Sequence, residues 1–446
     1  MEELLADPRV PPRDPLPALP RRRPTLPLLL VALAAVVGPP SGARAAAPLT
    51  RPHEVVVGYA GHQQPRVLHV HDVAAAIRRL HRRPGVRYAV PNVMAHVSGD
   101  FIPNDPGRIN QPGGWTQTQW NFIGLASVNA PAAWGHLIAA GRPGGRGVVV
   151  AVLDTGIAYR RFGRTPASPD LAGARFVKGW DFIGNDPYAN DHNGHGTHVA
   201  STIAERTNNG VGLTGLAYGA TIMPVKVLDD EGLGDAVEIA KGIRFATKHG
   251  AQVINLSLEL SVSTTAQEIP QLLDAIAYAH SKGVVVVAAS GNEAVPTLAY
   301  PARASDVLSV GATTEHACLS DYSNQGNGLD LVAPGGGPDA DRSDAGCQFD
   351  GPGGRNITQL TLTGIHRNVF GYPSRYEGTS MAVPHVSATA ALVIASGILG
   401  PHPTPTAVAH RLEQTAHDLG PPGYDTSYGY GLVDAGGATD PAIPVG

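Results

Sequence analysis

From residue 147 onward, short apolar runs alternate with longer amphipathic segments. The apolar runs lack polar alternation, which is typical of strands buried on both faces of a parallel sheet. We predict six such strands, at 148–153, 221–228, 253–258, 284–289, 307–310 and 329–333. Helices are predicted between them, at 196–206, 235–249, 267–282 and 379–396. This alternation indicates an α/β fold with a doubly wound, mostly parallel sheet flanked by helices.

A smaller α/β pattern precedes this body, with its core at residues 54–97. Residues 54–59 predict a strand, apolar positions at helical spacing follow at Val73, Ile77 and Leu80, and residues 86–97 are again extended. A unit of this size is marginally stable alone. We therefore expect it to depend on the larger body for stability.

The first residues have the features of an export signal. Three arginines at 21–23 precede an apolar run at 26–37, and Ala43-Arg44-Ala45, with small residues on either side of one position, follows. The run is shorter than the roughly 20 residues that span a bilayer. This order predicts a secretory signal peptide region at 1–47, hence a secreted protein without stable membrane insertion. Arg22-Arg23 leaves the general and the twin-arginine export routes both open.

Charge divides the chain into a basic front and an acidic body. The net charge is −4, but residues 1–97 carry +7 and residues 98–446 carry −11. An acidic body gives no reason to expect nucleic acid as a partner. The only cysteines, Cys318 and Cys347, are equally compatible with one disulfide and with two separate thiols.

Three polar motifs stand where the predicted sheet would form a site. Asp154 ends a buried strand, His195 opens a helix, and Ser380 lies at another helix start. Carboxyl ends of parallel strands are where such sheets build their sites. An acid, a histidine and a serine are the parts of an activated nucleophile. Each residue alone could equally be a turn former or a helix cap.

The residues around these three positions resemble the signatures of subtilisin-like serine proteases (subtilases, peptidase family S8). The matching segments are Asp154-Thr155-Gly156, 195–200 and 378–385, in the family's Asp, His, Ser order. The resemblance runs from about 104–106 to 431–435. It implies a peptidase domain at 104–446 and, at 48–103, a propeptide similar to the family's inhibitory, foldase-like module.

The resemblance implies a role for each matching residue. Ser380 is expected to attack the scissile carbonyl, His195 to take its proton, and Asp154 to orient His195. Asn292 matches the asparagine of the family's oxyanion hole. His198 and His385 match histidines of the motifs that are not catalytic, so we expect structural roles for them.

Substrate-binding segments follow from the same resemblance. Expected lining residues are Ser257 and Leu258 on one side, Gly232, Leu233 and Gly234 on the other, Ala289, Ser290 and Gly291 as the opposite pocket wall, and Ala299 as its floor. Glu259 departs from the family's usual glycine. With the acidic residues at 229–235, it could favour basic residues in the peptide, or the loop could simply be a solvated acidic surface.

Calcium is the cofactor that the resemblance implies, for stability and not for chemistry. Its expected ligands are oxygen atoms, which suit Ca²⁺, from Asp105, Asp170, Thr207, Asn209, Val211 and Leu213. Residues 336–372 form a Gly/Asp-rich insertion that could be a second cation site, a rim to the cleft or a plain surface loop. A disulfide between Cys318 and Cys347 would pin its first part.

These features together predict a secreted serine endopeptidase made as an autoprocessed zymogen. Its partners would be peptide or protein substrates and its own propeptide as an intramolecular inhibitor, and we expect a monomer. Two alternatives stay open: a dedicated processing protease for one protein substrate, and an inactive binding module that keeps the fold.

Overall fold

A computed structural model describes residues 50–62, 64–93, 101–163, 165–340, 347, 354–364 and 367–445. The predicted signal region at 1–47 lies outside the described residues. So do the end of the expected extended segment, at 94–97, and the acidic positions 341, 344 and 350 of the insertion.

The N-terminal module is a three-stranded antiparallel sheet with one helix. Its elements are β1 (Thr50–Tyr59), β2 (Arg66–His69), α1 (Val73–Leu80) and β3 (Val86–Val93). The sheet order is β2-β1-β3. Asp72 begins α1 by accepting a hydrogen bond from the Ala75 backbone N–H, 2.9 Å away. The predicted strand and helix are both present, whereas β2 was not predicted because its four residues are mostly exposed.

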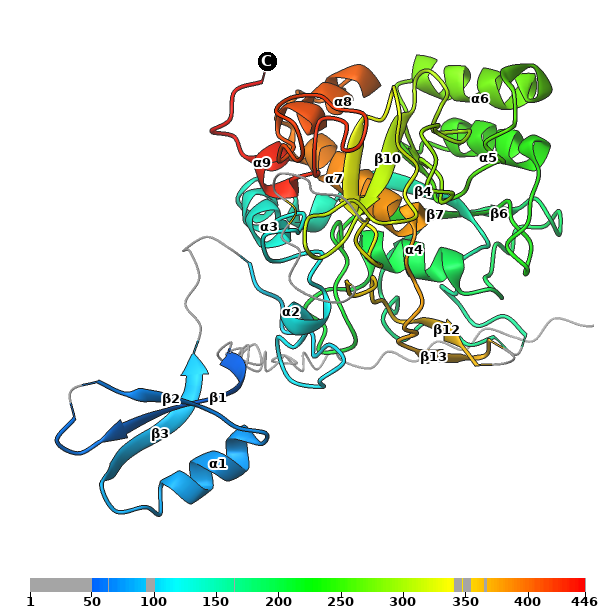
Figure 1. Cartoon of the computed structure of the whole chain (residues 1–446). Helices are drawn as coiled ribbons and strands as arrows, with labels where there is room; N and C mark the ends of the chain where they lie inside the picture. Colours follow the sequence, from blue (N-terminus) through cyan, green and yellow to red (C-terminus); the bar gives the residue numbers. More distant parts are fainter. Residues whose placement is uncertain are drawn as a thin grey trace, which may run out of the picture. The chain divides into compact units, whose positions relative to one another are not determined.

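The larger domain is built on an eight-stranded sheet whose strand pairs are all parallel. The order is β11-β10-β9-β8-β4-β7-β5, and β6 also pairs with β7. Strands β4, β6, β7 and β10 of this sheet are labelled in Figure 1. The strands are β4 (Val149–Asp154), β5 (Arg175–Phe176), β6 (Trp180–Asp181), β7 (Thr221–Lys226), β8 (Val253–Leu256), β9 (Val285–Ala289), β10 (Leu308–Thr313) and β11 (Leu331–Pro334). The six strands predicted from apolar runs are all present, and β5 and β6 are additional short strands.

Helices cover both faces of this sheet. They are α2 (Trp115–Thr118), α3 (Ala130–Ala139), α4 (His195–Ala204), α5 (Ala236–Lys248), α6 (Pro270–Ser281), α7 (Thr379–Ser396), α8 (Pro405–Gln414) and α9 (Ala435–Thr439). The buried side chains of β4 alternate between two cores. Val150 and Val152 pack with α3, α4 and α7, whereas Ala151 and Leu153 pack with α5 and α6. The predicted α/β fold with a doubly wound sheet is confirmed.

One helix differs from the sequence expectation, and another, α7, has the predicted bounds. The segment predicted as a helix at 267–282 is a short 3-10 turn (Ala266–Glu268) followed by α6, which begins at Pro270. Proline is favoured at a helix start because it has no N–H to leave unpaired there. Helix α7 is long and apolar enough to cross a membrane, but 78% of it is buried inside this domain, as expected for a core helix.

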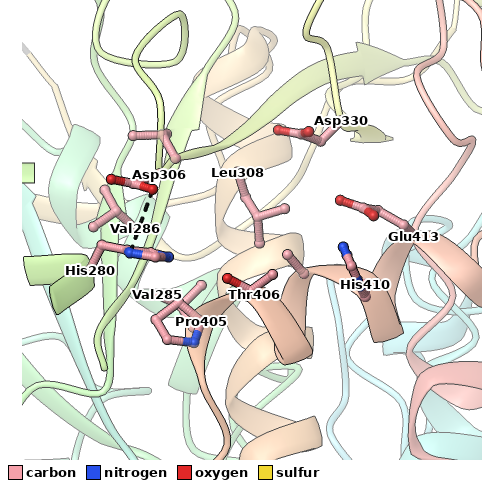
Figure 2. A pocket seen from close by; sticks show the side chains of 12 residues that line it. His280, Val285, Val286, Asp306, Leu308, Asp330, Pro405, Thr406, His410 and Glu413 are labelled. Carbon is pink, nitrogen blue, oxygen red and sulfur yellow. Dashed lines mark ion pairs between the residues drawn. The ribbon is translucent and has the colours of Figure 1, made fainter. Parts of the chain in front are cut away.

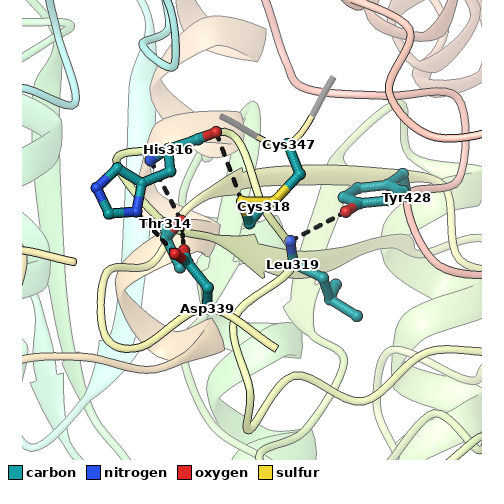
Figure 3. Close-up of a disulfide and its surroundings, with 7 residues drawn as sticks. All are labelled: Thr314, His316, Cys318, Leu319, Asp339, Cys347 and Tyr428. Atoms are coloured by element: carbon teal, nitrogen blue, oxygen red, sulfur yellow. Dashed lines mark hydrogen bonds and ion pairs between the residues drawn. A yellow bond between two sulfur atoms is a disulfide. The ribbon is translucent and has the colours of Figure 1, made fainter. Parts of the chain in front are cut away.

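The insertion contributes a hairpin of β12 (Thr361–Thr363) and β13 (Val369–Gly371). Cys318 and Cys347 form a disulfide, with their Cα atoms 4.5 Å apart (Figure 3). Next to it, the Asp339 carboxylate accepts a hydrogen bond from His316 Nδ1 at 2.8 Å (Figure 3). The start of the insertion is therefore tied to the segment after β10 by a covalent bond and by this contact.

Candidate active site

The carboxyl edge of the sheet brings together the acid and the histidine of the first two motifs. Asp154 is the last residue of β4 and is fully buried, and His195 is the first residue of α4. His195 Nδ1 donates a hydrogen bond to Asp154 Oδ1 at 2.8 Å. Helix α4 can approach β4 this closely because residue 196 is glycine: a Cβ there would meet the Gly156 carbonyl oxygen at 2.2 Å.

A second buried carboxylate, that of Asp191, holds this arrangement in place. It accepts hydrogen bonds from the strand end and from the first turn of α4, through Thr155 Oγ1 (3.0 Å), Asn193 N (2.8 Å), Gly194 N (2.9 Å), Thr197 N (3.0 Å) and Thr197 Oγ1 (2.6 Å). An anion is also favoured at a helix N-terminus, where backbone N–H groups lack partners. Asp191 lies four residues before His195, and its bonding role was not predicted.

Ser380 is the second residue of α7 and faces the same cavity as His195. That cavity, of about 370 Å³, is lined by both side chains. In this structure Ser380 Oγ donates to the carbonyl oxygen of Ser257 at 3.2 Å. The serine and the histidine therefore meet at one cavity. A hydrogen bond between them requires Ser380 Oγ to turn from Ser257 toward His195, as often occurs when substrate binds.

The electrostatics of His195 suit a proton acceptor. Burial lowers its pKa, but the charge of Asp154 and the hydrogen bond to it act in the opposite direction, and the Asp191 charge adds to them. The net result is a pKa above the ordinary value for histidine. The carboxylates thus stabilise the imidazolium form that a proton transfer to His195 would create.

The other two motif histidines are buried and have structural contacts. His198 Nε2 donates to the Ile357 carbonyl at 3.1 Å, and its ring stacks on Tyr376. His385 Nδ1 donates to the Met381 carbonyl at 2.9 Å. Burial lowers the pKa of His198 to about 3 and that of His385 to about 4. Both rings therefore stay neutral at physiological pH.

Asn292 follows β9 and is fixed next to the start of α7. Its Oδ1 accepts hydrogen bonds from Thr379 N at 2.8 Å and Thr379 Oγ1 at 3.1 Å. The chain can turn here because Gly291 has φ of +115°, and a Cβ would meet Asn324 Nδ2 at 2.1 Å. Because Oδ1 accepts these two hydrogen bonds, the Nδ2 group of Asn292 contacts a different partner. That partner is the Glu259 carboxylate, with Oε1 at 3.1 Å.

The structure gathers some of the predicted substrate-binding residues around the cavity and leaves others out. Those that line it are Gly232, Leu233, Gly234, Ser257 and Leu258. The predicted opposite wall and floor (Ala289, Ser290, Gly291 and Ala299) are not among its lining residues. The Glu259 side chain explains the difference, because it lines the cavity and its carboxylate lies against Gly291 and Asn292.

The acidic loop beside the cavity is used mainly for local structure. Asp229 accepts backbone hydrogen bonds from Glu231 and Leu233. Asp230 pairs with Lys226 at 2.9 Å. Asp235 caps the N-terminus of α5. These three carboxylates therefore have partners within the protein, which leaves Glu231 as the acidic residue of the loop that lines the cavity.

The predicted calcium ligands also lie together. Asp105 accepts hydrogen bonds from the backbone of Asn208 and Asn209, at 2.7 and 2.9 Å. Asp170 accepts them from Leu213 N at 2.7 Å and from Asn209 Nδ2 at 3.0 Å. Asn209 Oδ1 is used by the Val211 N–H. Among the described residues, no three His, Cys, Asp or Glu side chains surround one metal position.

Glu205 is a third carboxylate at this cluster that sequence reasoning missed. It is fully buried against Asp170, and neither of its oxygens has a hydrogen-bond partner outside the acidic cluster among the described residues. Burial raises the pKa of Asp105 to about 6 and that of Asp170 to about 7. Burial and the two neighbouring carboxyl groups also raise the pKa of Glu205 well above its ordinary value. Its position just after α4 gave no sign of this burial.

A second cavity, of about 220 Å³, also contains acids and histidines (Figure 2). It is lined by residues at the starts of β9 and β10, so it lies near the amino edge of the sheet, away from Ser380. His280 faces Asp306 at 3.5 Å, and Asp330 accepts hydrogen bonds from Ser309. No serine is among its lining residues; Thr406 is the residue there with a hydroxyl group.

Known proteins match most of this chain. The family model of the subtilases (peptidase family S8) matches residues 145–431. A thermophilic serine proteinase from Bacillus sp. (strain AK1) is 35% identical over 83% of this chain and 76% of that protein. Subtilisin BL from Lederbergia lenta is 38% identical over 71% of this chain and 97% of that protein.

Solved structures agree with these matches. A protease from Pseudoalteromonas arctica PAMC 21717 has a TM-score of 0.59 at 31% identity, covering 76% of this chain and 99% of that one. A lanthipeptide protease has a TM-score of 0.53 at 32% identity, covering 65% and 87%. Sequence, sheet topology and the Asp154–His195 pair lead to one conclusion. The chain belongs to the subtilase family of serine proteases, enzymes that hydrolyse peptide bonds.

Proposed function

We propose that this protein is a secreted serine endopeptidase that acts through Asp154, His195 and Ser380 and is made as a zymogen. The observation that carries the proposal is the 2.8 Å Asp154–His195 hydrogen bond at a cavity that Ser380 also lines. A base oriented by a buried carboxylate next to a serine hydroxyl is the arrangement that activates a nucleophile.

Ser380 and His195 divide the chemistry between them. Ser380 Oγ leaves the Ser257 carbonyl, gives its proton to His195 Nε2 and forms a bond to the carbonyl carbon of the substrate. His195 then gives the proton to the leaving amine as the peptide bond breaks, and water releases the acyl group by the same steps. Asp154 keeps the ring oriented and stabilises the imidazolium without taking the proton.

The negative charge that develops on the substrate oxygen would be stabilised by two donors. These are the Asn292 side-chain amide and the Ser380 backbone N–H at the start of α7. The Asn292 side chain is positioned before substrate binds, since its Oδ1 is bound to Thr379 at 2.8 Å. Donors fixed before the reaction need no reorganisation when the charge appears.

Substrate would bind as an extended strand between residues 232–234 and residues 257–258. Both segments line the cavity, and Leu233 has 69% of its surface exposed, so the rim is open to solvent. An extended peptide can use backbone hydrogen bonds for affinity and side-chain pockets for selectivity. Such a site accepts peptides and unfolded segments of proteins.

Residues 48–103 would serve as the propeptide, after export directed by residues 1–47. The described part of this module has a small core, whose buried side chains are Val55, Val57, Ala76, Leu80 and Ala89. Its basic character complements the acidic body, and opposite charges favour association. Cleavage near residues 96–104 would leave the peptidase domain, residues 104–446, which we expect to act as a monomer outside the cell.

Calcium would be held by the predicted ligands Asp105, Asp170, Asn209 and the carbonyls of Thr207, Val211 and Leu213, with Glu205 buried beside them. The residues fit a hard cation, because the donors are oxygen atoms and the Glu205 oxygens have no partner outside the acidic cluster among the described residues. Backbone carbonyls of the 207–213 loop would complete the ligand set. Three buried carboxyl groups repel one another when ionised, so a bound divalent cation would stabilise the fold and not take part in the reaction.

The raised pKa of His195 predicts how the rate depends on pH. Only neutral His195 can accept the serine proton, so kcat/KM should fall as pH drops through a midpoint above the ordinary value of about 6.5. Asp154→Asn removes the charge that raises this pKa, so its midpoint should move to lower pH and its rate should fall by about 10⁴-fold. Hydrolysis of a chromogenic peptide measures both, with Ser380→Ala as the inactive control. An acidic midpoint unchanged by Asp154→Asn would contradict the assignment.

Removal of calcium should destabilise the protein. A cation present at about 1,000 times its Kd stabilises the native state by about 4 kcal/mol, so EDTA should lower the midpoint temperature of unfolding. Asp170→Asn should reduce the difference between calcium and EDTA, whereas Asp274→Asn, at an exposed position on α6, should keep it. Equal midpoints for the wild type in calcium and in EDTA would rule out the site.

A further inference from the structure

Glu259 has contacts that the reaction itself does not require. It follows β8 in the segment that lines the cavity beside Ser380 and His195. Its Oε1 accepts a hydrogen bond from Asn292 Nδ2 at 3.1 Å, the amide assigned above to the oxyanion hole. In the absence of substrate, this carboxylate therefore engages the donor that the transition state needs.

The other oxygen of Glu259 has no partner. Oε2 is buried and has no hydrogen-bond donor among the described residues. Glu259 also makes no ion pair with any described Lys, Arg or His. A buried carboxylate without a counter-charge is costly unless something else neutralises it. Burial indeed raises the pKa of Glu259, and the nearby charge of Glu293 raises it further.

A second carboxylate borders the same space. A Cβ placed on Gly291 would meet Glu259 Oε2 at 2.8 Å and Glu293 Oε2 at 2.9 Å. Glu293 is itself held by Asn324 Nδ2 at 2.6 Å, so its position is fixed by the fold. Two carboxylates therefore meet beside Gly291 with no basic side chain between them. Asn324 Nδ2 fills the space at Gly291 itself, so a cationic group would reach this pair from the cavity, through Glu259.

Reaction geometry indicates which part of the substrate reaches this site. The carbonyl that Ser380 attacks belongs to the residue before the scissile bond, the P1 residue. Its oxygen must reach Asn292 Nδ2, and its side chain leaves the adjacent Cα. A carboxylate 3.1 Å from that amide therefore lies next to the P1 side chain. The neighbouring acidic loop is a weaker candidate, since Asp229, Asp230 and Asp235 already have partners.

We propose that Glu259 determines specificity by binding a cationic P1 side chain, arginine or lysine, and that this ion pair frees the Asn292 amide for the oxyanion. The proposal rests on the proposed endopeptidase activity. It has two parts that kinetics can separate. The attraction between the P1 cation and Glu259 is present in the ground state and in the transition state, so it lowers KM. Release of the Asn292 amide stabilises only the transition state, so it raises kcat.

Two peptide p-nitroanilides that differ only in P1 test the first part. One has arginine at P1 and the other has citrulline, which is nearly the same shape but uncharged. In the wild type, kcat/KM should be about 30-fold or more higher for arginine, the loss expected when one partner of a buried charge pair is missing. Glu259→Gln keeps the size and the polar contact but not the charge, so the ratio should fall to about 3 or less.

The second part is tested by comparing kcat alone. The wild type should show a higher kcat, and not only a lower KM, for the arginine peptide. Glu259→Ala, which leaves Asn292 without this partner, should raise kcat for the citrulline peptide above that of the wild type. Equal wild-type kcat values for the two peptides would overturn the coupling to Asn292.

Glu231→Gln is the matched control, because Glu231 lines the same cavity from the acidic loop. It should keep the arginine preference of the wild type. Loss of the preference in Glu231→Gln and its retention in Glu259→Gln would overturn the assignment to Glu259. A wild type that cleaves both peptides equally would overturn the P1 proposal without any variant. A folded wild type that cleaves neither peptide, nor unfolded casein, would instead contradict the proposed function.

Discussion

The buried carboxylate of Asp191 is the contact on which the geometry of the site depends. It is bound by Thr155 at the end of β4 and by backbone N–H groups at the start of α4. These bonds join the strand that carries Asp154 to the helix that begins with His195. Because the carboxylate is fully enclosed, each donor would be left unpaired without it, at a cost of about 1–3 kcal/mol for each. These hydrogen bonds to Asp191 therefore set the distance between Asp154 and His195.

The proposed oxyanion side of the site is built in a similar way around Asn324. Its side chain accepts hydrogen bonds from the backbone of Glu293 and Val295 and donates one to the Glu293 carboxylate. These contacts fix the turn that presents Asn292 to Thr379. Glu259 then connects the same turn to the substrate cavity. In this account, selectivity and charge stabilisation share a single amide, so a change at Glu259 affects both.

Much of this structure could be predicted from sequence, because the information was local. Six central strands and the helix carrying Ser380 follow from apolar runs, and three short motifs lead to Asp154, His195 and Ser380. The missed features depend on contacts between distant segments. The burial of Glu205 against Asp170 and the approach of Glu259 to Asn292 involve residues more than 30 positions apart. The short strand β2 lacked an apolar pattern because it is mostly exposed.

Covalent labelling of Ser380 tests the central claim most directly. A fluorophosphonate reacts with a serine only when a neighbouring base activates the hydroxyl, and the serine oxygen then replaces fluoride on phosphorus. Peptide mass spectrometry of the labelled mature protein should place the adduct on Ser380, with none in Ser380→Ala and much slower labelling in His195→Ala. A folded wild type that remains unlabelled, or that is labelled at another serine, would contradict the account.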